Sequence, residues 1–112
     1  MHMGSMAVLG ANKPKNLIHV VINNGAHETV GGMPVCGGSM DIPALASAAG
    51  YPSVFSADSE SSLQAVLDDA LPGAAGPVLI EVRCACGSRP DLGRPTTTPV
   101  DNRDAFMRFL QK

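Results

Sequence analysis

The chain has 112 residues, of which 45% are hydrophobic and 16% are charged, and its formal net charge is −2. This length suits one domain with a modest core, and this composition argues against intrinsic disorder. The near-neutral charge provides no overall basic field for nucleic acid or an anionic membrane. No stretch of the sequence approaches the roughly 20 apolar residues of a membrane span.

The charged residues are unevenly distributed. Residues 16–82 contain seven acids and no Lys or Arg, whereas six of the eight basic residues lie from Arg83 onward. Charge alone leaves two alternatives open, an anion site near the C-terminus or solvated arginines on an exposed tail. The cysteines Cys36, Cys84 and Cys86 form no CxxC pair, so we expect free thiols in a cytoplasmic protein rather than a zinc site.

The first part of the chain predicts a helix, a strand and a loop. Residues 1–11 are expected to form a short helix, and a turn signal at 12–15 leads into a strand over 17–23. This strand lacks apolar–polar alternation, which is typical of a parallel sheet covered on both faces. Residues 25–40 contain five glycines and a proline, so we expect a long, irregular loop there.

Two further helix and strand signals follow the loop. Asp41 is a suitable N-cap for a helix over 42–49, and Gly50 is a suitable stop after it. A short strand is predicted at 53–56. An amphipathic helix then extends to about residue 70.

The C-terminal part predicts a buried strand over 77–84 and a terminal helix over 101–111. That helix is expected to turn three apolar side chains inward, those of Phe106, Phe109 and Leu110. The alternation of strands and helices indicates a three-layer α/β fold with a short parallel sheet of about three strands flanked by helices. Because so thin a sheet leaves its edges uncovered, we expect residues 1–112 to form one partial domain.

The segment Asn23-Asn24-Gly25 is the strongest candidate site, because it follows the apolar strand directly. Ligand crevices of parallel sheets lie beyond the carboxyl ends of their strands. A side-chain amide oxygen and nearby backbone carbonyls can coordinate a hard cation there. Asn-Gly is also a common turn dipeptide, so a plain turn is the alternative.

Two segments resemble the phosphonopyruvate decarboxylase family of thiamine-diphosphate enzymes in phosphonate biosynthesis. They are residues 19–34 and the tail Gly-Ser-Arg-Pro-Asp-Leu-Gly-Arg-Pro-Thr-Thr-Thr-Pro at 87–99. The resemblance covers nearly the whole chain. It implies part of a thiamine-diphosphate-binding fold, the cofactors thiamine diphosphate and Mg²⁺, and a lyase that converts the 2-oxo acid 3-phosphonopyruvate to phosphonoacetaldehyde and CO₂.

The resemblance also implies roles for the segment Asn23-Asn24-Gly25, which we call the Asn-Asn-Gly corner, and for residues close to it. Asn24 would offer its side-chain oxygen and Ala26 its backbone carbonyl to Mg²⁺. Asn23 would brace the loop, and Gly25 belongs to the same cofactor-binding corner. Met33 would lie over the cofactor, with plain packing as the alternative.

Catalytic and substrate-binding residues are less clearly implied. The acid of several related decarboxylases corresponds to Val30 here, so its relay role does not transfer. His27 and Glu28 are the nearby titratable candidates for proton transfer, unless they only satisfy loop backbone groups. Arg89 and Arg94 are candidates for binding the phosphonate, unless they pair with acids of the chain.

The chain departs from the family pattern in one respect. The Gly-Asp-Gly motif, which supplies the family's anionic metal ligand, is absent. We therefore expect a C-terminal fragment of the cofactor-binding domain, inactive alone, that needs the N-terminal part of the enzyme and forms homo-oligomers. The alternatives are a sulfopyruvate decarboxylase subunit and a non-catalytic association module.

Overall fold

The computed structural model describes residues 3–93 and 95–111. Within these residues, three parallel strands form a sheet in the order β1-β5-β4. They are β1 (Ile18–Asn23), β4 (Ser53–Ala57) and β5 (Val78–Arg83). The predicted α/β class with a short parallel sheet of about three strands is confirmed, and each predicted strand agrees with the structure to within one residue at either end.

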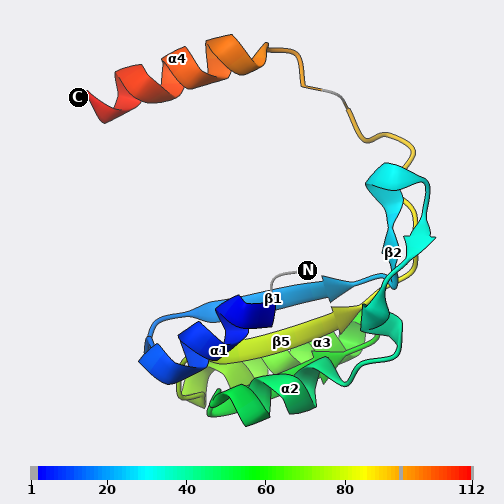
Figure 1. The fold of residues 1–112 in the computed structure, drawn as a ribbon, viewed down its shortest axis with the longest axis vertical. Helices are drawn as coiled ribbons and strands as arrows, with labels where there is room; N and C mark the ends of the chain where they lie inside the picture. Colours follow the sequence, from blue (N-terminus) through cyan, green and yellow to red (C-terminus); the bar gives the residue numbers. More distant parts are fainter. Residues whose placement is uncertain (1–2, 94, 112) are drawn as a thin grey trace.

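Helices cover the sheet on two sides. The first helix, α1 (Met3–Asn12), lies beside α2 (Ile42–Ala49), and both pack on the same face of the sheet. The third helix, α3 (Glu60–Ala65), lies on the opposite face (Figure 1). This is the arrangement that right-handed crossovers produce when the chain passes from β1 to β4 and then back to β5.

The ends of α2 and α3 follow local sequence signals. The Asp41 side chain accepts a 2.9 Å hydrogen bond from the Ala44 backbone N–H, and Gly50 ends α2 in the left-handed conformation with φ 103°. Beyond α3 the chain continues as a π-helical turn, η3 (Val66–Ala70), and a 3₁₀ turn, η4 (Leu71–Gly73). The predicted helix to residue 70 is therefore present, although its second half is more loosely wound.

The core lies between the sheet and the α1–α2 face. Leu79 and Ala46 are fully buried, Tyr51 is nearly so, and Met6 and Leu9 of α1 pack against them. In β5, the four residues from Val78 to Glu81 are all buried. This is expected of the central strand in a parallel sheet, because both its faces are covered.

The prediction that the first strand is covered on both faces is wrong. Ile18, Val20 and Ile22 of β1 are 51%, 50% and 64% exposed, whereas His19 and Val21 between them are half-buried. β1 is an edge strand, and α3 packs against β4 at the far side of the sheet. In the described part of the chain, the outer face of β1 therefore has no helix over it.

The glycine-rich loop contains more structure than expected. β2 (Ala26–His27) pairs antiparallel with β3 (Met33–Pro34), and Gly31 and Gly32 turn the chain between them with φ 89° and 73°. Two 3₁₀ turns, η1 (Glu28–Val30) and η2 (Cys36–Gly38), complete the loop. The loop is thus a short hairpin above the end of β1.

The last helix, α4 (Pro99–Leu110), stands apart from the sheet at the end of an extended segment (Figure 1). The prediction that it faces inward is wrong, since Phe106, Phe109 and Leu110 are 60%, 68% and 61% exposed. The radius of gyration is 17.2 Å, against about 13 Å for a compact chain of this length. None of the described helices is long and apolar enough to span a membrane.

Candidate functional site

The candidate site lies where β1 ends, beside the end of β5. The backbone carbonyl of Asn23 accepts a 3.0 Å hydrogen bond from the Cys84 N–H, so the two strands end together. The β2–β3 hairpin and the η2 turn follow immediately in the chain. The corner therefore sits at the carboxyl edge of the sheet, as the sequence predicts.

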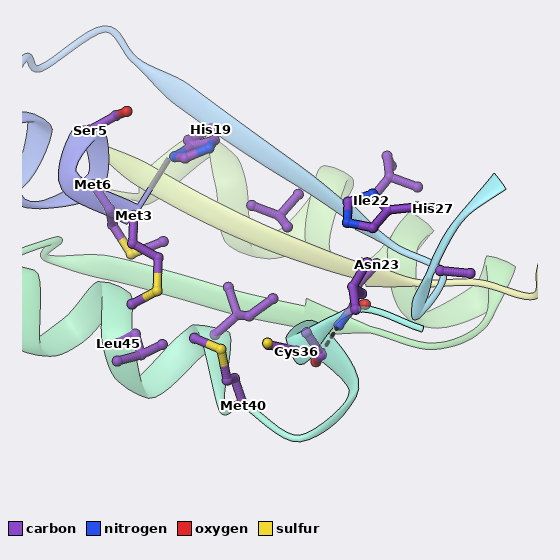
Figure 2. Close-up of a pocket in the computed structure, with 15 residues that line it drawn as sticks. Met3, Ser5, Met6, His19, Ile22, Asn23, His27, Cys36, Met40 and Leu45 are labelled. Atoms are coloured by element: carbon purple, nitrogen blue, oxygen red, sulfur yellow. Dashed lines mark hydrogen bonds between the residues drawn. The ribbon is translucent and has the colours of Figure 1, made fainter. Parts of the chain in front are cut away.

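Both polar atoms of the Asn23 side chain form hydrogen bonds that connect this corner to neighbouring segments. Its amide nitrogen donates to the Gly37 carbonyl at 3.1 Å and to Glu81 Oε1 at 2.8 Å. Its amide oxygen accepts from the Gly25 N–H at 3.2 Å. The first of these bonds is drawn in Figure 2. Asn23 thus holds the loop, the turn and the central strand together.

Asn24 is fixed by a second set of contacts. Its amide nitrogen donates to Glu28 Oε2 at 2.8 Å, and its amide oxygen accepts from the Ala26 N–H at 3.1 Å. Its backbone carbonyl lies 3.1 Å from the Cys86 thiol. Asn24 is half-buried, and the oxygen that the sequence assigns to a metal accepts one internal hydrogen bond. An amide oxygen has a second lone pair for another partner.

The two predicted proton-transfer residues have different surroundings. His27 is half-buried and lines the groove described next. Glu28 is exposed, and its carboxylate accepts hydrogen bonds from the Asn24 amide and the Gly87 backbone N–H. The structure thus gives Glu28 the bracing contacts that the sequence allows as the alternative, and its catalytic role stays a prediction.

An open groove of about 760 Å³ runs between α1, α2 and β1. Figure 2 shows Asn23 and His27 toward one end of it and Met3, Met6 and Leu45 toward the other. The remaining lining residues are mostly apolar: Val21, Ile22, Val35, Met40 and Ile42, with Ser5, His19, Ala26, Cys36 and Gly37. The groove therefore combines a polar end at the corner with a long apolar floor.

Of the other predicted site residues, those that the structure describes lie outside this groove. Met33 is 60% exposed on β3. Arg89 forms an exposed ion pair with Asp91, 3.1 Å between Nε and Oδ1, which is the alternative that the sequence leaves open. Arg94 lies outside the described residues. Gly25 adopts φ 71°, a conformation that favours glycine, so its backbone can turn sharply between the two asparagine contacts.

Glu81 is a site residue that the sequence reasoning missed. It is fully buried on β5 and contacts Asn23, while its other oxygen lies 3.2 Å from Arg83 Nε. One signal was available, since an acid within an otherwise apolar run of a central strand is unusual and requires a partner. The partner is Asn23. Its identity depends on the register of β1 against β5, in which Val21, two residues before Asn23, pairs with Glu81.

Comparison with known proteins gives a consistent picture. No family model matches the chain. Over 110 residues it is 38% identical to a phosphonopyruvate decarboxylase of Streptomyces viridochromogenes, covering 98% of this chain and 28% of that protein. Over 109 residues it is 37% identical to a phosphonopyruvate decarboxylase of Streptomyces hygroscopicus, covering 97% of this chain and 27% of that protein. The chain is homologous to a segment of phosphonopyruvate decarboxylase.

The resemblance that the sequence motifs predict is thereby confirmed. The chain spans less than a third of the length of these curated relatives. The phosphonopyruvate decarboxylase family uses thiamine diphosphate and Mg²⁺. No cluster of three or more His, Cys, Asp or Glu side chains that could hold a metal occurs among the described residues.

The donor chemistry of the corner nevertheless fits part of a magnesium–diphosphate site. Asn24 Oδ1 and the Ala26 carbonyl are neutral oxygens, the kind of ligand that Mg²⁺ accepts alongside carboxylate and phosphate oxygens. The Glu28 carboxylate lies against the Asn24 amide and adds negative charge beside them. The residues present can therefore supply the neutral ligands of such a site.

Proposed function

We propose that this chain forms part of a thiamine-diphosphate-dependent phosphonopyruvate decarboxylase. In this proposal the enzyme converts 3-phosphonopyruvate to phosphonoacetaldehyde and CO₂. The observation that carries the proposal is the 38% identity to such an enzyme over 98% of the chain. The position of the Asn-Asn-Gly corner at the carboxyl edge of a parallel sheet, where ligands of such folds bind, supports it further.

The corner has a defined part in this proposal. Asn24 Oδ1 and the Ala26 carbonyl are offered to Mg²⁺, while Asn23 and Gly25 set the shape of the loop that presents them. Met33 contributes to the cofactor-binding side of the hairpin. When bound, thiamine diphosphate supplies the electron sink for loss of CO₂, and the protein supplies positioning and charge.

Proton transfer and anion binding are assigned to residues near the corner and in the tail. His27, which lines the polar end of the groove, and Glu28, which is held beside Asn24, are the proposed proton-transfer residues. Arg89 and Arg94 are proposed to bind the phosphonate, since guanidinium groups bind such anions in a bidentate manner. For Arg89 this requires breaking its ion pair with Asp91. That ion pair is exposed to solvent and therefore weak.

The proposal includes partners. The sequence holds no Gly-Asp-Gly motif, so we propose that further polypeptide of the same enzyme supplies the anionic metal ligand. The exposed apolar faces of β1 and α4 favour contact with other protein, including a second copy in a homo-oligomer. Three exposed free thiols favour a reducing, cytoplasmic setting.

A second candidate function is a non-catalytic association module. It is favoured by the absence of a metal-binding cluster of His, Cys, Asp or Glu within residues 3–93 and 95–111. The two functions differ in their need for the corner, because association requires only the scaffold whereas the decarboxylase requires Asn24.

Complementation tests the proposal. The chain is mixed with the part of the Streptomyces viridochromogenes relative that it does not match, in the presence of thiamine diphosphate and Mg²⁺. We expect no CO₂ release from 3-phosphonopyruvate by the chain alone and measurable release by the mixture. Asn24→Ala should abolish that release, whereas Asn16→Ala, an asparagine in the turn before β1, should leave it unchanged.

Two results would contradict the proposal. Association of the two polypeptides with no release from either 3-phosphonopyruvate or sulfopyruvate would favour the association module. Release from sulfopyruvate alone would replace the proposed substrate.

A further inference from the structure

Glu81 is the only charged side chain that is fully buried in the described part of the chain. It lies on the central strand β5, where it pairs with Val21, two residues before Asn23 at the end of β1. A carboxyl group in such a position is costly unless its oxygens have partners. Its partners therefore show what it does in the fold.

The partners of Glu81 come from all three strands of the sheet. Oε1 accepts from the Asn23 amide of β1 at 2.8 Å. Oε2 lies 3.4 Å from the Ser56 hydroxyl of β4 and 3.2 Å from Arg83 Nε of β5. The bond to Asn23 is the shortest of the three, and it is the contact that leads directly to the corner.

The hydrogen bond to Glu81 determines the orientation of the Asn23 side-chain amide. Its nitrogen faces two acceptors, Glu81 Oε1 and the Gly37 carbonyl. A flipped amide would place its oxygen against both acceptors and its nitrogen against the Gly25 N–H, losing three hydrogen bonds at once. The Asn23 oxygen is thus directed at the Gly25 N–H, where the chain turns with φ 71°.

We propose that Glu81 is a positioning residue, whose buried carboxyl group orients Asn23 and thereby sets the direction in which the corner presents Asn24 and the Ala26 carbonyl. The link to metal binding rests on the function proposed above, whereas the link to the shape of the corner does not. The proposal is therefore tested first by a readout on the chain without cofactor.

Hydrogen exchange of the Gly25 amide, measured by NMR, is that readout. Glu81→Gln keeps the size of the side chain but presents an amide to the same neighbours. We expect the Gly25 amide to exchange about tenfold faster or more, as expected for weakening a hydrogen-bonded network that includes a charged group. Amides that bond in the β4–β5 ladder should keep their rates.

Arg83→Gln is the matched control. It removes the ion pair of Glu81 but leaves the contacts with Asn23 and Ser56 in place, so Gly25 exchange should stay within about twofold of the parent. An increase as large as that of Glu81→Gln would overturn the proposal. An equal acceleration of Gly25 and the β4–β5 ladder in Glu81→Gln would also overturn it, because it would show a role in global stability only.

If Glu81→Gln alone does not fold, the proposal can be tested by exchanging the donor and acceptor roles of residues 23 and 81. Asn23→Asp retains an oxygen for the Gly25 N–H but loses the donors, and it should loosen the corner. The double variant Asn23→Asp with Glu81→Gln restores the bond to residue 81 with reversed polarity but not the bond to the Gly37 carbonyl, so the Gly25 amide should exchange more slowly than in Asn23→Asp alone. If the Gly25 amide of the double variant exchanged at least as fast as that of Asn23→Asp, the result would contradict the proposal.

Metal binding is measured separately, with Mn²⁺ and thiamine diphosphate as the probe. We expect paramagnetic broadening of the Ala26 amide in the parent chain complemented as above, and less broadening in Glu81→Gln. If Gly25 responds to Glu81→Gln but Mn²⁺ broadens nothing near the corner, the positioning role stands and the proposed metal site fails. If Mn²⁺ broadens both proteins equally, Glu81 does not position the ligands.

Discussion

The side-chain amide of Asn24 donates a 2.8 Å hydrogen bond to the carboxylate of Glu28. The same carboxylate accepts the backbone N–H of Gly87, and the Cys86 thiol lies 3.1 Å from the Asn24 carbonyl. Glu28 therefore joins the corner at the end of β1 to the segment that leaves β5. The tail resembling that of phosphonopyruvate decarboxylases begins at this junction.

Removing the carboxylate should loosen this junction without unfolding the domain. Because Glu28 is exposed, Glu28→Ala is expected to lower the free energy of unfolding by only about 1 kcal/mol. The Cys86 thiol should then react faster with iodoacetamide relative to Cys36, which serves as an internal reference. Glu60→Ala, at an exposed acid in the first turn of α3, is the control. Equal Cys86 to Cys36 labelling ratios in all three proteins would show that Glu28 does not hold the tail.

The contact between α1 and α2 depends on a glycine. A Cβ atom built on Gly10 would lie 1.8 Å from the Ala49 carbonyl oxygen, whereas a Cβ on Gly4 of the same helix meets nothing within 4 Å. Gly10→Ala must push the helices apart, so we expect it to lower the free energy of unfolding by about 2 kcal/mol or more. Gly4→Ala should instead raise it by about 0.5–1 kcal/mol, because alanine favours the helix.

Urea unfolding followed by circular dichroism measures both changes. The two variants add the same methyl group to the same helix, so the difference between them isolates the close approach of α1 to α2. Equal effects of the two substitutions would mean that α1 does not pack on α2 as the structure shows. Since Met3 and Met6 of α1 line the groove, displacement of α1 should also widen it.

The parts of this fold that local signals specify could be predicted from the sequence. The Asp41 cap and the Gly50 stop delimit α2 because both act within a few residues of themselves. The apolar run ending at Asn23 predicted β1, since strand-forming residues and a turn signal adjoin there. The edge position of the Asn-Asn-Gly corner followed from the same run.

Features that depend on distant parts of the chain could not be predicted. The exposure of Val20 follows from the position of β1 at the edge of the sheet, which the apolar pattern of the strand does not reveal. The exposure of Phe109 follows from the extended segment before α4, which separates an amphipathic helix from the core. The pairing of Glu81 with Asn23 joins residues 58 positions apart and depends on the register between β1 and β5.

Tyr51 is expected to make the stability of the chain depend on pH in the alkaline range. Burial raises the pKa of its hydroxyl above the ordinary value of 10.0. The hydroxyl also lies 3.1 Å from His19 Nδ1. Because the folded state favours the neutral phenol, its contribution to stability is complete below the pKa of the unfolded chain, near 10. It is lost as pH rises through the higher pKa of the folded state.

Urea unfolding between pH 8 and pH 11 checks this sign. We expect the free energy of unfolding to fall above about pH 10 in the parent, and to fall less steeply in Tyr51→Phe. At neutral pH, Tyr51→Phe should cost about 1 kcal/mol for the lost hydrogen bond. Tyr51 is the single tyrosine of the chain, so tyrosinate absorbance reports its titration directly. A titration at the ordinary pKa in the folded protein would contradict the burial.

Helix α4 presents an apolar stripe without a partner in the described structure. Phe106, Phe109 and Leu110 are spaced so that they share one side of the helix, and all three are more than half exposed. The outer face of β1, formed by Ile18, Val20 and Ile22, is a second exposed apolar surface. We expect α4 of one copy to pack on β1 of another, because the extended segment holds α4 away from its own sheet.

Light scattering over a concentration series measures this association. The parent chain is expected to exceed the monomer mass at high concentration. Phe109→Asp removes an apolar contribution of about 1.5–3 kcal/mol and should shift the association at least about tenfold toward higher concentration. Arg108→Asp places the same carboxylate on the polar side of α4 and should shift it far less. A parent chain that remains monomeric throughout, or equal shifts in the two variants, would show that the stripe of α4 does not mediate self-association.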